Sequence, residues 1–157
     1  MSAAQPLVPA QALRWQALEP SQLDALMRIE QRAYSHPWSR GNFIDSMQAG
    51  YAVQTLVIAD TLVGYYVAMQ GVDEVHLLNI TVAPEHQGQG LAVLMLDTLA
   101  LWSRHCRARC LWLEVRASNV RALQVYERYG FRRVGVRKGY YPDHGRREDA
   151  VVMSLML

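Results

Sequence analysis

A short glycine-bearing segment carries the strongest chemical signal in the sequence. It follows the apolar stretch that ends at Val82 and reads Gln87-Gly88-Gln89-Gly90-Leu91-Ala92. Glycines let the backbone approach a ligand closely and turn its N–H groups toward it. The first turn of a helix leaves further N–H donors unpaired, and these bind phosphate. The segment therefore favours phosphate binding, and a plain strand-to-helix turn is the alternative.

Two well-known phosphate-binding motifs do not fit this segment. The P-loop requires a lysine after its last glycine, and no lysine follows Gly90. The dinucleotide fingerprint requires a third small residue, where this sequence has Val93. It also requires repeated βαβ units, whereas the preceding segments predict antiparallel hairpins. The segment therefore matches neither of these motifs.

Two side chains further along the chain are suited to proton transfer. Glu114 lies at the end of an apolar run, and Tyr126 lies in a segment with helical spacing. A carboxylate can remove a proton from an amine, and a phenol can donate one to a leaving group. Each side chain also has a purely structural interpretation. Glu114 would then be a strand-end acid paired with Arg116, and Tyr126 would be a core tyrosine.

The spacing of apolar residues predicts the elements that position these groups. Ser21 and Asp24 have the form of a capping box, and Ser39 is placed to cap a second helix. The helix after Gly90 is apolar on most sides, so we expect it to be largely buried. A polar loop joins the last two predicted strands. The predicted strands are 13–18, 51–59, 62–70, 74–82, 110–115, 131–137 and 150–157, and the predicted helices are 21–34, 39–50, 91–104 and 119–129.

This order of elements predicts an α/β (α+β) fold with a mixed, mostly antiparallel sheet flanked by about four helices. The length of 157 residues indicates a single domain. We expect residues 1–12 to form a flexible lead-in and residues 13–157 to form the domain. We expect a monomer or a weak dimer.

Composition and charge exclude several classes of protein. The net charge of +2 is too small to indicate nucleic-acid binding. The apolar runs are shorter than the roughly 20 residues that a membrane span requires, and the N-terminus lacks the features of an export signal. With two cysteines, we expect reduced thiols and a cytoplasmic location. His105, Cys106 and Cys110 provide only three possible ligands, at an unusual spacing, where a structural zinc site needs four, so no metal is expected.

The glycine segment resembles the Gln/Arg-x-x-Gly-x-Gly/Ala motif of the GCN5-related N-acetyltransferases. From about Leu13 to its end, the chain is similar to one branch of that family, the bacterial ribosomal-protein-alanine N-acetyltransferases (RimI type). The glycine segment alone would indicate only the family, whereas Leu111–Asn119 and Tyr140–Ala150 point to the branch. The other matching segments are Ile29–Ala33, Pro37–Ser39, and Tyr126-Glu127 with Gly130-Phe131.

The resemblance implies transfer of an acetyl group from acetyl-CoA to an amine by direct attack, without a covalent enzyme intermediate. An α-amine has a pKa of about 7.7–8.0, so a base must remove its proton near neutral pH. The resemblance assigns this role to Glu114 and the acid role to Tyr126. The backbone N–H of Val82 would stabilise the oxyanion. The implied cosubstrate residues are Ile80, Thr81, Val82, Gln87, Gly88, Gln89, Gly90, Leu91, Ala92, Val93 and Asn119, of which Asn119 is equally suited to capping its helix.

The resemblance also implies an acceptor, the N-terminal alanine of small-subunit ribosomal protein eighteen. Trp38, Tyr140 and Tyr141 match positions near the substrate in relatives, and closure of a loop by aromatic side chains is the alternative. Asp143 and Glu148 are placed to attract a basic N-terminal segment.

The sequence departs from the family pattern at two positions. Relatives often carry basic residues where this chain has Gly88 and Val93. We expect the loss of these cations to weaken coenzyme binding, while the cradle of backbone N–H groups does not depend on side chains.

Two other functions remain open at this point. The acceptor is alternatively a small amine, a polyamine or a lysine side chain. The chain is alternatively a coenzyme-binding module without activity, which the presence of both Glu114 and Tyr126 argues against.

Overall fold

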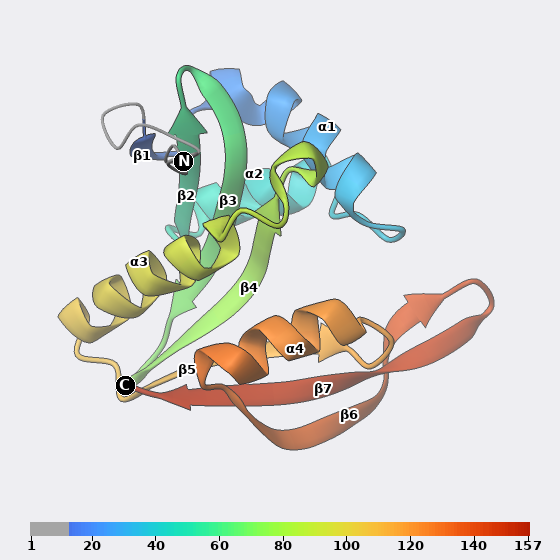
Figure 1. Cartoon of the computed structure of the whole chain (residues 1–157). Coiled ribbons are helices and arrows are strands. Elements are labelled where there is room, and N and C mark those ends of the chain that lie inside the picture. The colour runs from blue at the N-terminus through green and yellow to red at the C-terminus, as the bar shows by residue number, and fades with distance from the viewer. Residues whose placement is uncertain (1–12) are drawn as a thin grey trace, which may run out of the picture.

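The computed structural model describes residues 13–157, so the predicted lead-in at residues 1–12 lies outside the described residues. It shows one seven-stranded sheet in the order β1-β2-β3-β4-β5-β7-β6 with four α-helices (Figure 1). Neighbouring strands are antiparallel except for β4 and β5. The expected fold is confirmed. The strands are β1 (Leu13–Ala17), β2 (Ala52–Ile58), β3 (Thr61–Gln70), β4 (Glu74–Val82), β5 (Cys110–Arg116), β6 (Arg132–Asp143) and β7 (Arg146–Met156), and the helices are α1 (Leu23–Ala33), α2 (Arg40–Gln48), α3 (Leu91–His105) and α4 (Val120–Tyr129).

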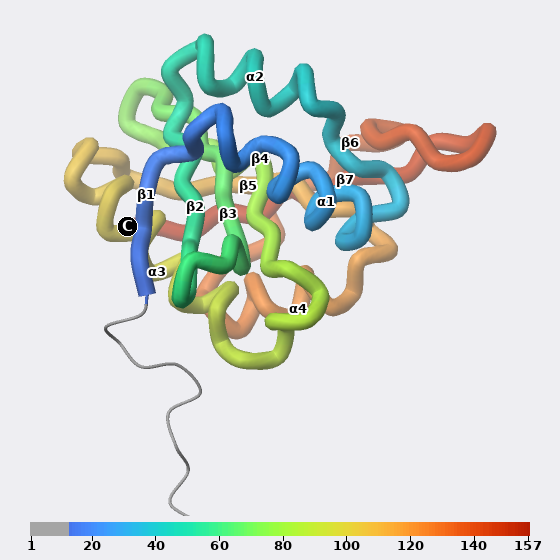
Figure 2. The backbone as a smooth tube through the Cα atoms, turned by 90° about the horizontal axis from the view of Figure 1, so that it is seen from above, coloured from blue at the N-terminus to red at the C-terminus, as the bar shows by residue number. Residues whose placement is uncertain are grey.

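Helices cover both faces of the sheet (Figures 1 and 2). Leu26 of α1 and Phe43 of α2 pack with Tyr65 on one face. Leu99 of α3 and Leu123 of α4 share the opposite core, which also contains Tyr66. Successive residues of a strand point to opposite faces, so the adjacent tyrosines of β3 enter different cores. The described helices include none that is long and apolar enough to cross a membrane.

Strand β4 contains a bulge that changes the direction of its side chains. Two adjacent residues of β3 pair with Leu77 and Asn79, which leaves Leu78 as an extra residue. Before the bulge, Leu77 belongs to the core beneath α3 and α4. Beyond the bulge, Asn79 and Thr81 bond side chains of the α1 region, and Ile80 packs against the core on the α3 side.

Strands β4 and β5 pair over only part of their lengths. Leu77 with Leu113 is the last pair between them. Beyond this pair, β4 continues along β3 to Val82, and β5 continues along β7 to Arg116. The two strands therefore diverge and leave an edge of β4 beside the glycine segment (Figure 1).

A buried carboxylate connects α1 to this part of the sheet. Glu30 is 1% exposed. Its Oε1 accepts hydrogen bonds from the Tyr65 hydroxyl at 2.7 Å and from Asn79 Nδ2 at 3.1 Å, and its Oε2 accepts one from the backbone N–H of Trp38 at 3.1 Å. Burial of a carboxylate is costly unless its oxygens are hydrogen-bonded. The three bonds meet this requirement and fix α1, the segment after it and the β4 bulge relative to one another.

The helix boundaries agree with the sequence except near α1. A short 3-10 turn at Pro20–Gln22 precedes α1, and its capping box uses Glu19 and Gln22. The expected capping box of Ser21 and Asp24 is therefore wrong. The expectation for α2 is confirmed, because Ser39 Oγ accepts a hydrogen bond from a backbone N–H of the first turn.

Two other expectations need correction. The polar loop predicted between the last two strands is mostly strand, because β6 extends to Asp143 and β7 begins at Arg146. This segment pairs across the hairpin beyond an irregularity in β6, and the alternation of its side chains is too irregular to show in the sequence. Helix α3 is also less buried than its composition indicates, because Leu101 is 67% exposed and Val93 is 45% exposed.

We expect Glu30→Ala to lower the free energy of unfolding by about 2–4 kcal/mol, because it leaves three buried donors without their acceptor. Tyr65→Phe removes one of the three bonds and should cost about 1–2 kcal/mol. Gln31→Ala changes the neighbouring exposed position of α1 and is the control. Urea denaturation measures all three variants, and a Glu30→Ala protein as stable as the control would contradict this role.

Candidate active site

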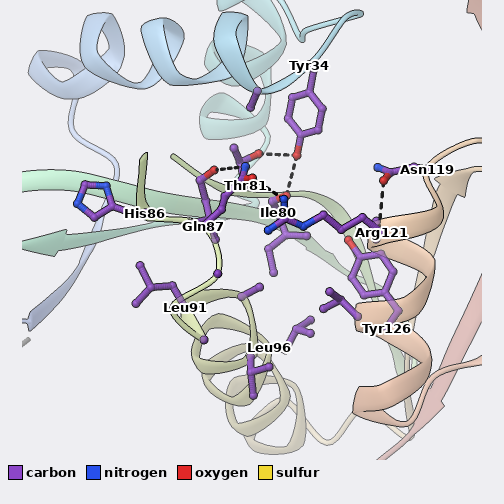
Figure 3. Close-up of a pocket in the computed structure, with 18 residues that line it drawn as sticks. Tyr34, Ile80, Thr81, His86, Gln87, Leu91, Leu96, Asn119, Arg121 and Tyr126 are labelled. Atoms are coloured by element: carbon purple, nitrogen blue, oxygen red, sulfur yellow. Dashed lines mark hydrogen bonds between the residues drawn. The ribbon is translucent and has the colours of Figure 1, made fainter. Parts of the chain in front are cut away.

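A pocket of about 370 Å³ lies beside the diverging part of β4. This volume falls within the range of about 300–1,000 Å³ that is typical of small-molecule sites. Its walls come from the end of α1, β4, the glycine segment and the first two turns of α3 and α4 (Figure 3). Gln89 is the one predicted cosubstrate residue outside the lining. The predicted residues inside it are Ile80, Thr81, Val82, Gln87, Gly88, Gly90, Leu91, Ala92, Val93 and Asn119, together with Tyr126.

The two glycines of the segment have left-handed backbone conformations. The φ angles are 77° at Gly88 and 79° at Gly90, where other residues would be strained. A Cβ at either position would meet open space. Glycine is therefore required by the backbone conformation at these positions. It is not required by crowding, because no atom lies close to the position of a Cβ at either residue. Gly90 is the N-cap of α3 and provides no side chain to cap it. The N–H groups of the first turn are thus available to an anion, and the segment fits a phosphate group.

Gln87 and Arg121 connect two walls of the pocket. The Gln87 amide donates from Nε2 to the carbonyl oxygen of Val82 at 3.2 Å, and its Oε1 accepts from Arg121 Nη1 at 3.0 Å. Sequence reasoning missed Arg121. Its position two residues after the predicted cap Asn119 could have indicated that it lies in the first turn of α4.

Tyr34 is a second lining residue that sequence reasoning missed. Its hydroxyl lies 2.8 Å from both the carbonyl oxygen of Ile80 and the Thr81 Oγ1, so it fixes the pocket edge of β4. Burial raises the pKa of Tyr34 to about 12, and this hydroxyl stays protonated near neutral pH.

Tyr126 lines the pocket from α4, opposite β4 (Figure 3). Its ring packs edge-on against Phe131 at a centroid distance of 5.6 Å. Burial raises the pKa of Tyr126 well above its ordinary value, with smaller contributions from neighbouring tyrosines. The hydroxyl therefore keeps its proton near neutral pH and can donate it within the pocket.

Asn119 both caps α4 and lines the pocket. Its Oδ1 accepts a hydrogen bond from the backbone N–H of Ala122 at 3.2 Å. The capping interpretation is therefore correct, and it places the Asn119 side chain at the pocket wall.

Glu114 lies outside the pocket lining. It is on the part of β5 that diverges from β4, one residue beyond the last pair between the two strands. Its side chain is 5% exposed, and Oε1 accepts a hydrogen bond from Arg137 Nη1 at 3.1 Å. Its Oε2 is buried and has no hydrogen-bond partner among the described residues. The expected alternative partner is wrong, because Arg116 instead forms an ion pair with Glu148 at 3.1 Å.

His76 of β4 lies beside Glu114, with 3.5 Å between its Nε2 and the Glu114 Oε1. Its ring stacks on Trp112, with centroids 3.5 Å apart and an interplanar angle of 9°. Burial lowers the pKa of His76, against the opposing effect of Glu114. The ring is therefore neutral near neutral pH, and Arg137 is the charged partner of the carboxylate.

Two aromatic side chains of β6 lie near Glu114. Tyr140 and Tyr141 contact each other edge-on at 4.9 Å between ring centroids. Guanidinium groups lie over both rings, Arg137 at 4.2 Å from the Tyr140 centroid and Arg116 at 4.5 Å from that of Tyr141. Burial is the main cause of the raised pKa of both tyrosines, and the charge of Glu114 is the second cause.

Trp38, the third predicted acceptor residue, lies in the segment between α1 and α2. It packs against Phe43 at 5.1 Å between ring centroids and belongs to a different cluster from the β6 tyrosines. The histidines form no pattern in the sequence, yet the rings of His36 and His144 lie 5.1 Å apart. The segment that carries Trp38 therefore meets the β6–β7 hairpin.

Comparison with known proteins identifies the family. Residues 23–131 match the Acetyltransferase (GNAT) family. The [ribosomal protein bS18]-alanine N-acetyltransferase of Escherichia coli is 37% identical over 139 residues, which is 88% of this chain and 94% of that protein.

Solved structures agree with this assignment. The crystal structure of the ribosomal-protein-alanine N-acetyltransferase from Escherichia coli matches with a TM-score of 0.83 and 36% identity, over 92% of this chain and 93% of that one. A putative acetyltransferase from Salmonella typhimurium with its cofactor acetyl-CoA matches with a TM-score of 0.75 and 19% identity, over 93% and 94% of the two chains, and shows the shared fold. This chain belongs to the GNAT family of acetyltransferases, which use acetyl-CoA.

Proposed function

We propose that this protein transfers the acetyl group of acetyl-CoA to the N-terminal alanine amine of ribosomal protein bS18 in the cytoplasm. The choice of acceptor is supported by the similarity to the Escherichia coli enzyme that has this activity in its name. The two proteins are 37% identical over 88% of this chain. The pocket and the neighbouring carboxylate support the reaction, because they provide an anion cradle, an acid and a base around the diverging strands.

In this proposal Glu114 takes the proton from the attacking amine. Arg137 holds its Oε1, while its Oε2 is buried and has no hydrogen-bond partner in the described part of the chain. A buried acceptor without a hydrogen bond costs about 1–3 kcal/mol. An ammonium group from the acceptor would provide the missing bond at Oε2, and the carboxylate would then accept its proton.

Tyr126 donates a proton to the thiolate that leaves when the thioester breaks. Its support is its place in the pocket lining and its raised pKa, which keeps the hydroxyl protonated. In this proposal, Glu114 serves the amine that attacks the carbonyl group, and Tyr126 serves the thiolate that leaves it.

The backbone N–H of Val82 is proposed to stabilise the oxyanion of the tetrahedral intermediate. The next N–H along the chain is that of Ala83, which donates to the carbonyl oxygen of Val63 near the start of β3. Alternate N–H groups of a strand point to opposite sides. The Val82 N–H therefore points away from β3, toward the opening between β4 and β5, which is where an oxyanion donor is required.

The acceptor peptide is proposed to enter from the side of the β6–β7 hairpin, past Tyr140 and Tyr141. These side chains lie near Glu114, and the segment that carries Trp38 meets the same hairpin. Asp143 at the end of β6 adds a carboxylate that a basic N-terminal segment would favour.

We expect Glu114→Gln to lower kcat at least about 100-fold while leaving the KM for acetyl-CoA within about twofold of the parent, because the amide cannot accept the proton. Steady-state assays with an alanine-first peptide measure both constants. The control is Glu127→Gln, which removes an exposed carboxylate paired with Arg133. Parental turnover in Glu114→Gln would exclude this residue as the base.

Tyr126→Phe should lower kcat by about 10–100-fold, since the leaving thiolate loses its proton donor. Tyr129→Phe is the matched control on the same helix, because its hydroxyl bonds Asp97 and lies outside the pocket lining. The same kinetic assay compares the two variants. If both substitutions had equal effects, the loss would reflect packing of α4 and not proton donation.

The acceptor is tested with a panel of amines. We expect acetylation of a peptide with the bS18 N-terminus at its first alanine, and none of the same peptide blocked at the α-amine or of spermidine. Mass spectrometry of the products locates the acetyl group. Acetylation of a lysine in the blocked peptide, or of spermidine alone, would show that the proposed acceptor is wrong. Transfer to no amine would indicate a coenzyme-binding module.

A further inference from the structure

The pocket contains one permanently charged side chain among the residues that the structure describes, and this is Arg121 of α4. The segment from Ala83 to Val93 contains no lysine or arginine. Its one carboxylate, that of Glu85, accepts two hydrogen bonds from Arg32 of α1, at 3.0 and 3.2 Å. The acetyl-CoA molecule carries a pyrophosphate and a ribose phosphate, so its site must balance several negative charges.

The contacts of Arg121 place its guanidinium group at the start of the glycine segment. Its Nη1 donates to Gln87 Oε1 at 3.0 Å, and the Gln87 amide is in turn held by the carbonyl oxygen of Val82 at 3.2 Å. Figure 3 shows the Arg121 side chain extending from α4 toward Gln87. A guanidinium has five N–H donors in a planar fork that matches phosphate oxygens, and the bond to Gln87 uses one of them.

We propose that Arg121 binds the pyrophosphate of acetyl-CoA and supplies the positive charge that the glycine segment lacks. The proposal rests on the proposed function in one respect, the use of acetyl-CoA. The backbone N–H groups after Gly90 provide neutral donors at the N-terminus of α3, and Arg121 faces the same segment from α4. The pyrophosphate is chosen over the ribose phosphate because Gln87, the partner of Arg121, begins the segment that forms this cradle.

The first test is direct binding of CoA, measured by isothermal titration calorimetry. Arg121→Ala should weaken binding about tenfold, as expected for the loss of one charge-assisted hydrogen bond. Arg121→Lys retains the charge without the planar fork and should recover part of the loss. Arg128→Ala removes an exposed arginine from the same helix outside the pocket lining and should bind like the parent.

The second test distinguishes the two kinds of phosphate. Dephospho-CoA lacks the ribose phosphate but retains the pyrophosphate. We expect the ratio of dissociation constants between Arg121→Ala and the parent to be the same for CoA and for dephospho-CoA. A ratio near one with dephospho-CoA would show that Arg121 contacts the ribose phosphate, and the proposal would be overturned.

The outcomes separate this proposal from the proposed function. If Arg121→Ala bound CoA as tightly as the parent, the role of Arg121 would be wrong while the acetyltransferase function stood. If the parent bound CoA but acetylated no alanine peptide, the acceptor would be wrong while the role of Arg121 stood.

Discussion

The separation of β4 from β5 is the constraint on which the rest of the site depends. Beyond Leu77, β4 keeps its pairing with β3 but has no strand partner on its other edge within the described residues. Such an edge needs support, because its backbone groups lack a second ladder. Glu30 provides part of it from the α1 side by holding Asn79 at the bulge, and Tyr34 provides the rest by bonding the carbonyl oxygen of Ile80. The position of this edge is therefore set by hydrogen bonds from the α1 side.

This opening divides the chemistry between its two arms. Along the diverging part of β4, the glycine segment and the first two turns of α3 and α4 form a pocket with neutral donors and, among the described residues, a single guanidinium. On the diverging part of β5, Glu114 is buried, with one oxygen held by Arg137 and the other without a hydrogen-bond partner in residues 13–157. In the proposed reaction, the proton acceptor and the anion cradle are thus kept apart, so the carboxylate would not repel the phosphates of the cosubstrate. This arrangement suits the proposed reaction, in which an amine and a thioester would enter from different sides.

The proposed role of Arg121 bears on the expectation that the absence of basic residues at positions 88 and 93 weakens coenzyme binding. Glycine at position 88 permits a left-handed turn, and the N–H groups of the cradle do not depend on side chains. The one acid of the segment, Glu85, is paired with Arg32. Because both of these side chains are about half exposed, the pair is worth little in stability. Its local effect is to neutralise the one carboxylate of the segment, and Arg121 is the one permanently charged side chain in the pocket lining among the described residues.

The sequence by itself determined the type and order of the elements, because apolar periodicity, caps and turn residues are local signals. Strand β4 and helix α2 were predicted almost to the residue, and the glycine segment was placed correctly before α3. The final hairpin was not, since its pairing follows a register shift between Arg137 and Tyr141 of β6 that the sequence pattern does not reveal. Only the tertiary structure decided which partners the chemical groups have. Arg137 faces Glu114 across 23 positions of sequence and Arg121 faces Gln87 across 34, and such pairs arise from the packing of separate elements, which leaves no periodic trace in the chain.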